Sequence, residues 1–438
     1  AGVNPNDADT QVTTRGKFAR FYPKDNLVFR GITIERFGHN ILSGPRWRQT
    51  GCVLQFGVPG VKPFFHMHDV LVEDVTLRWN SGGGASFHST QGLTVRELDS
   101  LHNGGGGNVL GTVQNMLWED VTTNFNNWRG ALGHKRGWAI GGTKFHVFRD
   151  AIIRRHTALG NEMIGIWMDV NCENFLVEDA ISIDNTSGIF LEISKGPMEV
   201  RGGLFADNNR SAIKLLCAEH VTLRDNLFVM SDGQQRSGTG YDENIGRNTQ
   251  KAAAAVEYLF YNRSSVKSTA QWDVFGTELF GKPKTHTVYA LPGPVLAEGN
   301  VIVAGEQRFV MSMSAWLPPE RRSPETIGGA WTGAGNVYFG ADENSFLFTD
   351  IEVPGESPDH KKQLGLSSWS QRFEESESTF VDPQFADAGN FDFTVSSDSP
   401  LAERADELPL IRLDPETVAE IRAWQQFLAD LRPHEPAP

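Results

Sequence analysis

A sequence repeat with a period of roughly 22–24 residues is the feature that most constrains how this 438-residue chain can fold. Seven short segments of alternating apolar and polar residues share one pattern with an apolar residue at the centre. An eighth, 26–33, lies 43 positions before the first, which fits either two turns of a solenoid or one turn with a long insertion. The seven central residues, separated by 23, 23, 29, 30, 23 and 23 positions, are Val72, Val95, Trp118, Val147, Val177, Val200 and Leu223.

This period is typical of a right-handed parallel β-helix, a solenoid in which each turn of chain (a coil) adds one short strand to each sheet. Helical repeats do not fit, because the segments are β-branched and are interrupted by Asn and Gly more often than helices tolerate. Leucine-rich repeats would need a recurrent Leu pattern that is absent. The sequence therefore predicts an all-β chain folded as a right-handed parallel β-helix.

The regularity fades after about residue 230, and the small and polar residues of 231–290 predict a long insertion. Apolar residues return at helical spacing between Pro415 and Leu431, with Asp414 placed to cap the helix. A solenoid must cover its last coil, so we expect this helix to be a C-terminal cap. The predicted organisation is one β-helix domain over 1–410, followed by a helix and tail over 411–438.

The beginning of the chain offers no equivalent cover. Strand-like sequence starts within about 20 residues of Ala1, and an open solenoid end would expose apolar core and unpaired strand edges. We therefore expect a preceding segment, a separate chain or a second copy of this chain to complete the first coils.

Charge and composition argue against several classes of binding partner. The net charge of −14 argues against nucleic acid and anionic membrane surfaces, and no apolar run is long enough to span a membrane. Three cysteines form an odd number without metal-type spacing, so we expect buried free thiols at Cys52, Cys172 and Cys217.

The chemistry is concentrated in two copies of one short pattern. Gly-Ile-Trp-Met-Asp (165–169) returns as Gly-Ile-Phe-Leu-Glu (188–192), so that Asp169 and Glu192 hold the same place in successive repeats. Strand alternation predicts that both carboxylates point outward. Because neighbouring strands are about 4.7–4.9 Å apart, we expect the carboxyl groups roughly 5–6 Å apart. Retaining glycosidases separate theirs by about 5–5.5 Å and inverting ones by about 6.5–9.5 Å. The alternative interpretation is that the two carboxylates belong to a row of solvated acidic side chains without a catalytic role.

The same alternation predicts a site around the pair. Lys214, about one coil further on, is placed to tune Glu192. Aromatic rings with a polar rim suit a sugar's C–H face, so Trp138, Trp167 and Phe190 are candidate platforms. The predicted inward residues are Ile166, Met168, Val170, Ile189, Leu191 and Ile193, and candidate binders of the substrate are Lys195, Arg136, His134, Asn161, His88 and Asn108. For each of these residues taken alone, the competing explanation is a structural role at a turn, on a sheet face or in the core.

Gly-Ile-Trp-Met-Asp, followed one repeat later by Ile-Phe-Leu-Glu-Ile-Ser-x-Gly-Pro, resembles the β-helical glycoside hydrolases typified by the family 120 β-xylosidases. The resemblance covers 130–230 and 375–402. It implies that Asp169 is the nucleophile and Glu192 the acid/base of a retaining, exo-acting enzyme. It also implies secretion, with an extracellular or periplasmic location, and an oligosaccharide substrate. Lys195 stands where that family tends to have His, which puts the adjacent subsite in doubt.

Two other functions stay open. A polysaccharide lyase or epimerase acting on uronate polymers would use a Lys or Arg base with Ca²⁺; the acidic charge and the lack of a multi-carboxylate cluster count against it. A non-catalytic, adhesin-like solenoid would only bind glycans. His66 and His68 lack a third metal ligand, and the glycines 104–107 do not lie between a strand and a helix as a phosphate loop would. We expect neither a metal nor a cofactor.

Overall fold

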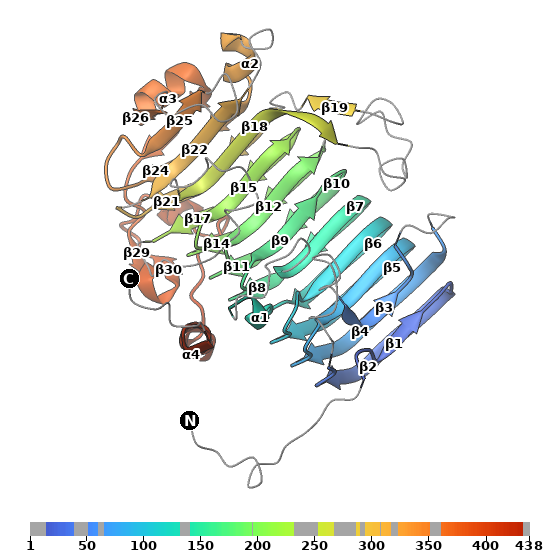
Figure 1. Cartoon of the computed structure of the whole chain (residues 1–438). Helices are drawn as coiled ribbons and strands as arrows, with labels where there is room; N and C mark the ends of the chain where they lie inside the picture. Colours follow the sequence, from blue (N-terminus) through green and yellow to red (C-terminus); the bar gives the residue numbers. More distant parts are fainter. Residues whose placement is uncertain are drawn as a thin grey trace, which may run out of the picture.

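The chain forms a right-handed parallel β-helix, as predicted (Figure 1). The computed structural model describes residues 15–38, 51–59, 65–131, 141–194, 196–231, 253–266, 286–289, 294–306, 308–316, 323–350 and 361–431. Coils are stacked from the blue N-terminal end at lower right of Figure 1 to the orange coils at upper left. Within the described ranges, no helix is long and apolar enough to cross a membrane.

Three parallel sheets run along the solenoid. The site sheet contains β1 (Ala19–Phe21), β3 (Cys52–Phe56), β9 (Ile164–Asp169), β12 (Ser187–Ser194), β15 (Ser211–Ala218), β18 (Ala254–Val266), β22 (Phe309–Trp316) and β25 (Phe346–Asp350). The second sheet contains β2 (Asp25–Glu35), β4 (Met67–Arg78), β10 (Glu173–Glu178), β13 (Met198–Arg201), β16 (Val221–Arg224), β20 (Val295–Glu298), β23 (Trp331–Ala334) and β27 (Glu374–Ser376).

The third sheet contains β8 (Thr157–Leu159), β11 (Ile181–Ile183), β14 (Leu204–Ala206), β17 (Leu227–Met230), β21 (Val301–Ala304), β24 (Val337–Phe339) and β28 (Thr379–Phe380). Three long strands turn the corner between the site sheet and the second sheet: β5 (Gly83–Leu101), β6 (Asn108–Thr122) and β7 (Gly141–Arg154). Antiparallel additions are β19 (His286–Tyr289), β26 (Lys361–Leu364) and the pair β29 (Phe385–Asp387) and β30 (Asp392–Val395). The short helices are α1 (Trp128–Ala131) and α2 (Pro324–Gly328).

Strand register confirms most of the predicted repeat. Phe29 pairs directly with Val72, so the long step between the first two segments is one coil with a long insertion. The stack continues as predicted, except that Ile153 and not Val147 follows Trp118. The prediction was wrong there because the coil between β6 and β7 is longer than its neighbours, which moves the equivalent segment further along the chain.

The predicted insertion at 231–290 contains one regular coil strand. β18 pairs in parallel register with β15 on one side and β22 on the other. Much of the remaining range lies outside the described residues.

The C-terminal helix exists but does not cap the solenoid. In α4 (Pro415–Leu431), Asp414 accepts a hydrogen bond from the Thr417 backbone N–H (2.8 Å). Trp424 then donates its indole N–H to the Gly160 carbonyl (2.8 Å), which places α4 beside the middle coils (Figure 1). The outer face of the third sheet is apolar there and buries the apolar stripe of the helix.

A different helix packs at the last coils. In α3 (Leu366–Arg372), Trp369 is fully buried and packs against Phe346 of β25, with ring centroids 5.2 Å apart. The prediction named α4 as the helix over the last coils, whereas α3 packs there. It was wrong because an apolar stripe on a helix does not reveal which apolar surface of the solenoid the helix packs against.

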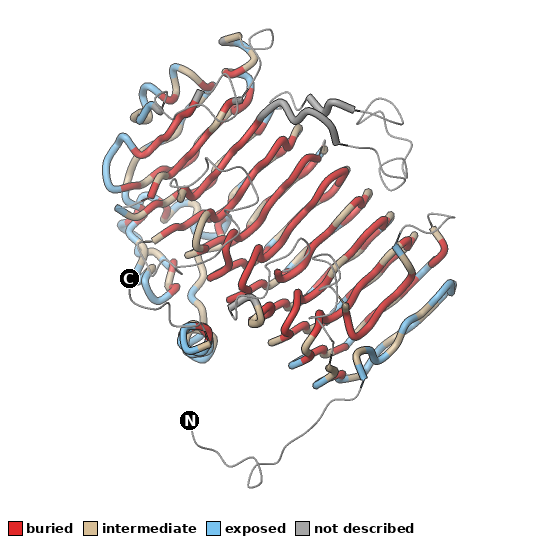
Figure 2. The backbone as a smooth tube through the Cα atoms, viewed as in Figure 1, coloured by how far each residue is buried: buried red, intermediate tan, exposed pale blue. Residues whose placement is uncertain are grey.

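Burial increases away from the first coil (Figure 2). Val28 in β2 is 56% exposed, whereas the later coils are mostly buried. The three cysteines are buried and free, as predicted. The expected second chain or second copy over the first coils stays a prediction.

A ladder of buried asparagines runs through successive coils. Each side-chain amide donates to the carbonyl oxygen of the next one, at 2.9–3.2 Å, through Asn80, Asn103, Asn126, Asn161, Asn185 and Asn208. Asn161 also donates to the Thr123 carbonyl (2.7 Å) and is fully buried. Its predicted role as a substrate binder is therefore corrected: both ends of its amide are engaged inside the solenoid.

Asn161→Ala is expected to lower the free energy of unfolding by about 3 kcal/mol, because it leaves several buried hydrogen-bonding groups without partners. Urea denaturation measures the change. Thr222→Ala, on the outer side of the second sheet, is the control and should change stability by no more than about 0.5 kcal/mol. An Asn161 variant as stable as the control would contradict the structural role of the ladder.

Candidate active site

The two predicted carboxylates lie side by side. Asp169 in β9 is the direct register partner of Glu192 in β12. Both are withdrawn from solvent, with 2% of Asp169 and 9% of Glu192 exposed. Their position on adjacent strands follows from the sequence repeat, which adds one strand per coil.

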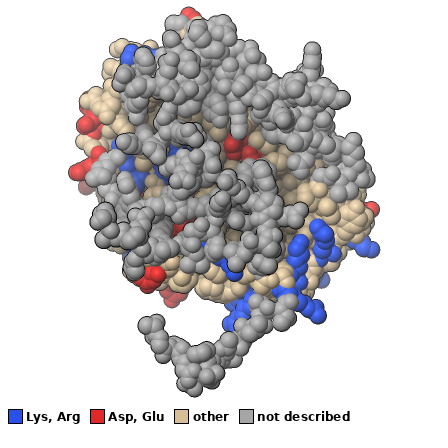
Figure 3. Space-filling view, in the orientation of Figure 1, with Lys and Arg blue, Asp and Glu red and all other residues tan. Residues whose placement is uncertain are grey.

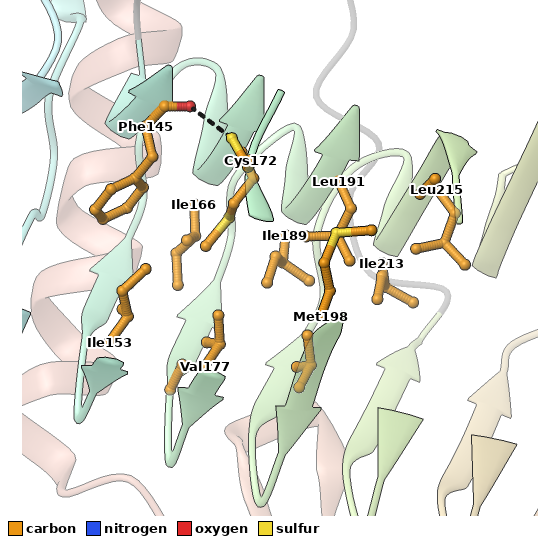
Figure 4. Close-up of a cluster of buried hydrophobic side chains, with 14 of the residues drawn as sticks. Phe145, Ile153, Ile166, Cys172, Val177, Ile189, Leu191, Met198, Ile213 and Leu215 are labelled. Carbon is orange, nitrogen blue, oxygen red and sulfur yellow. Dashed lines mark hydrogen bonds between the residues drawn. The ribbon is translucent and has the colours of Figure 1, made fainter. Parts of the chain in front are cut away.

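The interior side of these strands is as predicted. Ile166, Met168, Ile189 and Leu191 belong to the central core, and Figure 4 shows Ile166, Ile189 and Ile213 on neighbouring strands of that core. The side chains of Asp169 and Glu192 therefore lie on the outer face of the site sheet.

Val170 and Ile193 were predicted to point inward, and that prediction was wrong. Both pack in a separate apolar cluster with Trp167 and Phe190. The reason is a left-handed backbone conformation, with φ of 43° at Val170 and 46° at Ile193. One left-handed residue breaks the two-residue alternation and returns the next side chain to the same face.

The same left-handed conformation recurs at the equivalent position of six adjacent coils. It is found at Ser89 (φ 56°), Thr112 (φ 62°), Val147 (φ 54°), Val170, Ile193 and Cys217 (φ 48°). For β-branched residues this conformation is strained. At Val147, Val170 and Ile193 it places an apolar side chain in the cluster with Trp167 and Phe190.

Lys144 is a functional candidate that the sequence analysis missed. It is in register with Trp167 on β9, and its ammonium lies 2.6 Å from Asp169 Oδ2. Its side chain is 3% exposed. The ammonium also lies 3.5 Å from the centre of the Trp167 ring, within cation–π distance.

Electrostatics favour an ionised Asp169. Burial opposes its charge, but the positive charge of Lys144 and side-chain hydrogen bonds outweigh burial and lower the pKa of Asp169. Burial lowers the pKa of His146 to about 4, so this neighbouring imidazole is neutral near pH 7.

Glu192 lies directly beside Asp169 in the register of the two strands. The indole N–H of Trp167 donates to Glu192 Oε2 (3.0 Å) and fixes its orientation.

The predicted aromatic platforms are closed to solvent. Trp167 and Phe190 stack with centroids 5.6 Å apart, and they are 2% and 0% exposed. In this structure they pack around the carboxyl pair and offer no open face to a sugar.

Lys214 lies near the pair, as predicted, but its contacts are with another carboxylate. It is in register with Phe190 and Glu257, and its ammonium lies 3.5 Å from Glu257 Oε2. Arg210 holds the same carboxylate with two hydrogen bonds, of 3.0 and 2.7 Å. Glu257 and Arg210 were also missed by the sequence analysis.

The remaining predicted binders do not gather at the carboxylates. Asn108 is 1% exposed, and its carbonyl oxygen accepts from the Ala85 backbone N–H and the Ser100 hydroxyl, so the prediction that it binds substrate is corrected. His88 lies two strands before His146 on the same sheet, with its pKa lowered to about 4 by burial. The other four candidates, His134, Arg136, Trp138 and Lys195, lie outside the described residues.

An open groove of about 1050 Å³ lies on the second sheet, away from the carboxylates. Leu71, Thr94, Leu117, Ile152 and Leu176 form a row along it, one from each coil. Figure 3 shows charges of both signs on the viewed face, with Lys and Arg gathering at lower right, over the first coils.

Among the described residues, no group of three or more His, Cys, Asp or Glu side chains could hold a metal ion. His66 instead accepts the Val58 backbone N–H (3.1 Å).

Comparisons with known proteins agree on the fold. A family model described as "Right handed beta helix region" matches residues 64–228, and no curated protein matches. One similar solved structure is the Azotobacter vinelandii mannuronan C-5 epimerase AlgE6 A-module, with 16% identity, coverage of 83% of this chain and 76% of that one, and a TM-score of 0.49.

Two more distant structures have the same architecture. The periplasmic alginate epimerase AlgG has 10% identity, 75% and 69% coverage and a TM-score of 0.39. PfbA, a surface adhesin of Streptococcus pneumoniae, has 10% identity, 75% and 78% coverage and a TM-score of 0.44. At these identities the likeness concerns the fold alone. The chain is a right-handed parallel β-helix.

Proposed function

We propose that this protein is a retaining glycoside hydrolase with Asp169 as nucleophile and Glu192 as acid/base. One observation carries the proposal: two buried carboxyl groups lie in direct register on adjacent strands, and the Lys144 ammonium lies 2.6 Å from one of them, Asp169. Environments that push two pKa values apart divide a pair into an ionised group and an acid, and the positive charge of Lys144 lowers the pKa of Asp169. Retaining glycosidases need such a division between two carboxyls at short separation.

The residues fit the two steps of the double displacement. Asp169 attacks the anomeric carbon while Glu192 gives its proton to the departing oxygen. Glu192 then removes a proton from the water that releases the sugar. Lys144 keeps the nucleophile ionised before attack, and the Trp167 N–H holds the acid in place. A sugar bound for this reaction requires the two carboxyls to lie about 5–5.5 Å apart.

The resemblance to family 120 β-xylosidases supports an exo-acting enzyme on a plant or microbial oligosaccharide. It also supports an extracellular or periplasmic location. Both belong to the proposal.

Trapping the covalent intermediate tests the mechanism. Aryl 2-deoxy-2-fluoro glycosides, spanning xylosides, arabinosides, glucosides, galactosides and uronides, are incubated with the protein, followed by peptide mass spectrometry. We expect one glycosyl adduct, on the peptide containing Asp169. Proton NMR of a cleaved aryl glycoside should show that the first product has the substrate's anomeric configuration. An inverted first product would rule out the retaining mechanism.

A uronate epimerase or lyase is the second candidate, favoured by the buried cations Lys144 and Lys214 and the partly buried Arg210 around the site. Epimerisation is also the activity named for two of the similar structures. Such an enzyme removes the proton next to the uronate carboxylate and needs a cation to stabilise the resulting charge. Uptake of deuterium at that carbon, or an unsaturated product absorbing in the near ultraviolet, would identify it.

A further inference from the structure

The open groove on the second sheet is a surface that the proposed hydrolase reaction does not use. Four of the five side chains along its floor are aliphatic, and one of them, Ile152, is 43% exposed. Because neighbouring strands lie about 4.8 Å apart, the floor is a straight strip roughly 19 Å long. The floor consists of Leu71, Thr94, Leu117, Ile152 and Leu176, one residue from each of five consecutive coils.

One rim of the groove is formed by polar residues at the corner of the coils. Asp69, Asn115, Asp150 and Asn174 line it, each with a left-handed backbone conformation. The Asp150 carboxylate accepts hydrogen bonds from the side-chain amides of Asn174 (2.6 Å) and Gln114 (3.3 Å). Asn115 and Asn174 are exposed. This rim therefore offers oriented amide and carboxylate groups to a ligand that carries hydroxyl groups.

The other rim is a row of charges that alternate in sign from coil to coil. The row lies two residues beyond the floor on each strand and consists of Glu73, Arg96, Glu119, Arg154 and Glu178. Arg154 donates to Glu119 (2.6 Å), and Arg96 lies 3.3 Å from the same carboxylate. Among the residues that line the groove, acidic side chains outnumber basic ones. The groove therefore disfavours a polyanionic ligand.

The width of the floor argues against a docked helix. The third sheet, which does bury a helix, has two apolar positions on each strand, such as Leu204 and Ala206 of β14 or Leu227 and Val229 of β17. The groove floor is one side chain wide, with polar residues two positions away on both sides. Because a helix packs through an apolar stripe at least about 100° wide, the groove suits a narrower occupant.

An extended peptide is narrow, but it carries an N–H and a C=O at every residue. The strands beneath the groove are already paired on both sides, as Thr94 is with Leu71 and Leu117, so a peptide backbone would meet only side chains. A sugar chain instead has apolar C–H faces and hydroxyl groups along both edges. This pattern matches an apolar floor between two polar rims, and a straight floor requires an extended chain, such as β-1,4-linked sugars form.

We propose that the groove binds a neutral, extended glycan along the solenoid axis, with about one sugar unit over each coil. The C–H faces of the sugars pack on the floor, and their hydroxyl groups bond to Asn115, Asp150 and Asn174. Strand β7 contributes Ile152 to the groove and Lys144 to the candidate active site, so a glycan held here lies around one corner from that site. The proposal goes beyond the hydrolase function, because binding in the groove does not require cleavage.

Calorimetry with the wild-type protein tests the groove. The probes are thio-linked β-1,4-xylosyl, glucosyl and mannosyl oligosaccharides of two to seven units, whose sulfur linkages resist hydrolysis. For at least one series, we expect the Kd to fall by about tenfold or more between three and five units, as additional sugars cover the floor. It should then level off, because the floor has five rows.

Ile152→Lys places a charge in the middle of the floor and should raise the Kd for the pentasaccharide by about tenfold or more. Because Ile152 is 43% exposed, this change is compatible with folding. Thr332→Lys is the matched control and should keep the wild-type Kd. Thr332 occupies the same row of the second sheet, beyond the groove.

Binding that does not depend on chain length, or that Ile152→Lys leaves unchanged, would overturn the proposal. So would an absence of binding in all three series, or tighter binding of an oligouronate than of the neutral sugars. A dimer that Ile152→Lys dissociates, seen by light scattering without glycan binding, would assign the floor to a second copy of this chain instead. Groove binding without cleavage of any aryl glycoside would keep this proposal and overturn the hydrolase, whereas cleavage without groove binding would do the reverse.

Discussion

Asp169→Asn is expected to lower kcat/KM on the best aryl glycoside by about 10⁴-fold or more, because it removes the nucleophile. The amide cannot form the glycosyl ester, and its neutral side chain no longer pairs with Lys144, 2.6 Å away in the wild-type protein. Steady-state kinetics at the pH optimum measures the loss. In Asp169→Ala, added azide should restore turnover and yield the glycosyl azide of opposite anomeric configuration.

Folding must be controlled, since removing one member of a buried ion pair leaves the other uncompensated. The double variant Asp169→Asn with Lys144→Met removes both charges and should recover thermal stability without recovering activity. Asp179→Asn is the matched control: Asp179 has a φ of 53°, which Asn tolerates, and it lies on another corner. Wild-type turnover in a folded Asp169→Asn variant would end the nucleophile assignment.

Glu192→Gln is expected to reduce kcat/KM by about 10²–10⁴-fold on substrates with poor leaving groups, the usual contribution of a positioned general acid. The rate of the first step should fall only slightly on 2,4-dinitrophenyl glycosides, because their leaving group needs no proton. Deglycosylation should remain slow, because the base for the water is also lost. Rapid-quench kinetics should therefore show a burst of phenol followed by a slow steady state.

Glu199→Gln, on the second sheet and lining the open groove, is the control for this variant and should behave as wild type. A loss in Glu192→Gln that is equal for good and poor leaving groups would contradict the acid role. It would instead indicate that Glu192 only orients Trp167 or Asp169.

The sequence predicted more of the fold than of the site, because the fold is periodic. A repeat of nearly constant length, alternating apolar positions and Asn or Gly at the corners are local features, and each reappears in the structure. The register of Asp169 with Glu192 could be read from the same period. Lys144 and His146 lie one repeat before Trp167 and Asp169, so the repeat also contained a signal for them. Aligning 144–151 with the second sheet concealed it.

Other parts of the site had no such signal. Glu257 meets Lys214 across a stretch of chain that includes a long insertion, and no period predicts that pairing. The left-handed residues Val170 and Ile193 reversed an alternation that their β-branched side chains favoured. The lowered pKa of Asp169 depends on Lys144, which the assembled sheet brings beside it.

The sequence by itself determined the solenoid, its coil length and the adjacency of the two carboxylates, since these follow from interactions between neighbouring coils. The tertiary structure decided which charges surround the pair, that α4 packs against the third sheet, and that α3 packs at the last coils. These depend on contacts between segments separated by irregular connections. In these parts of the chain, the length of the irregular connections determines which surfaces pack together more than local secondary-structure preference does.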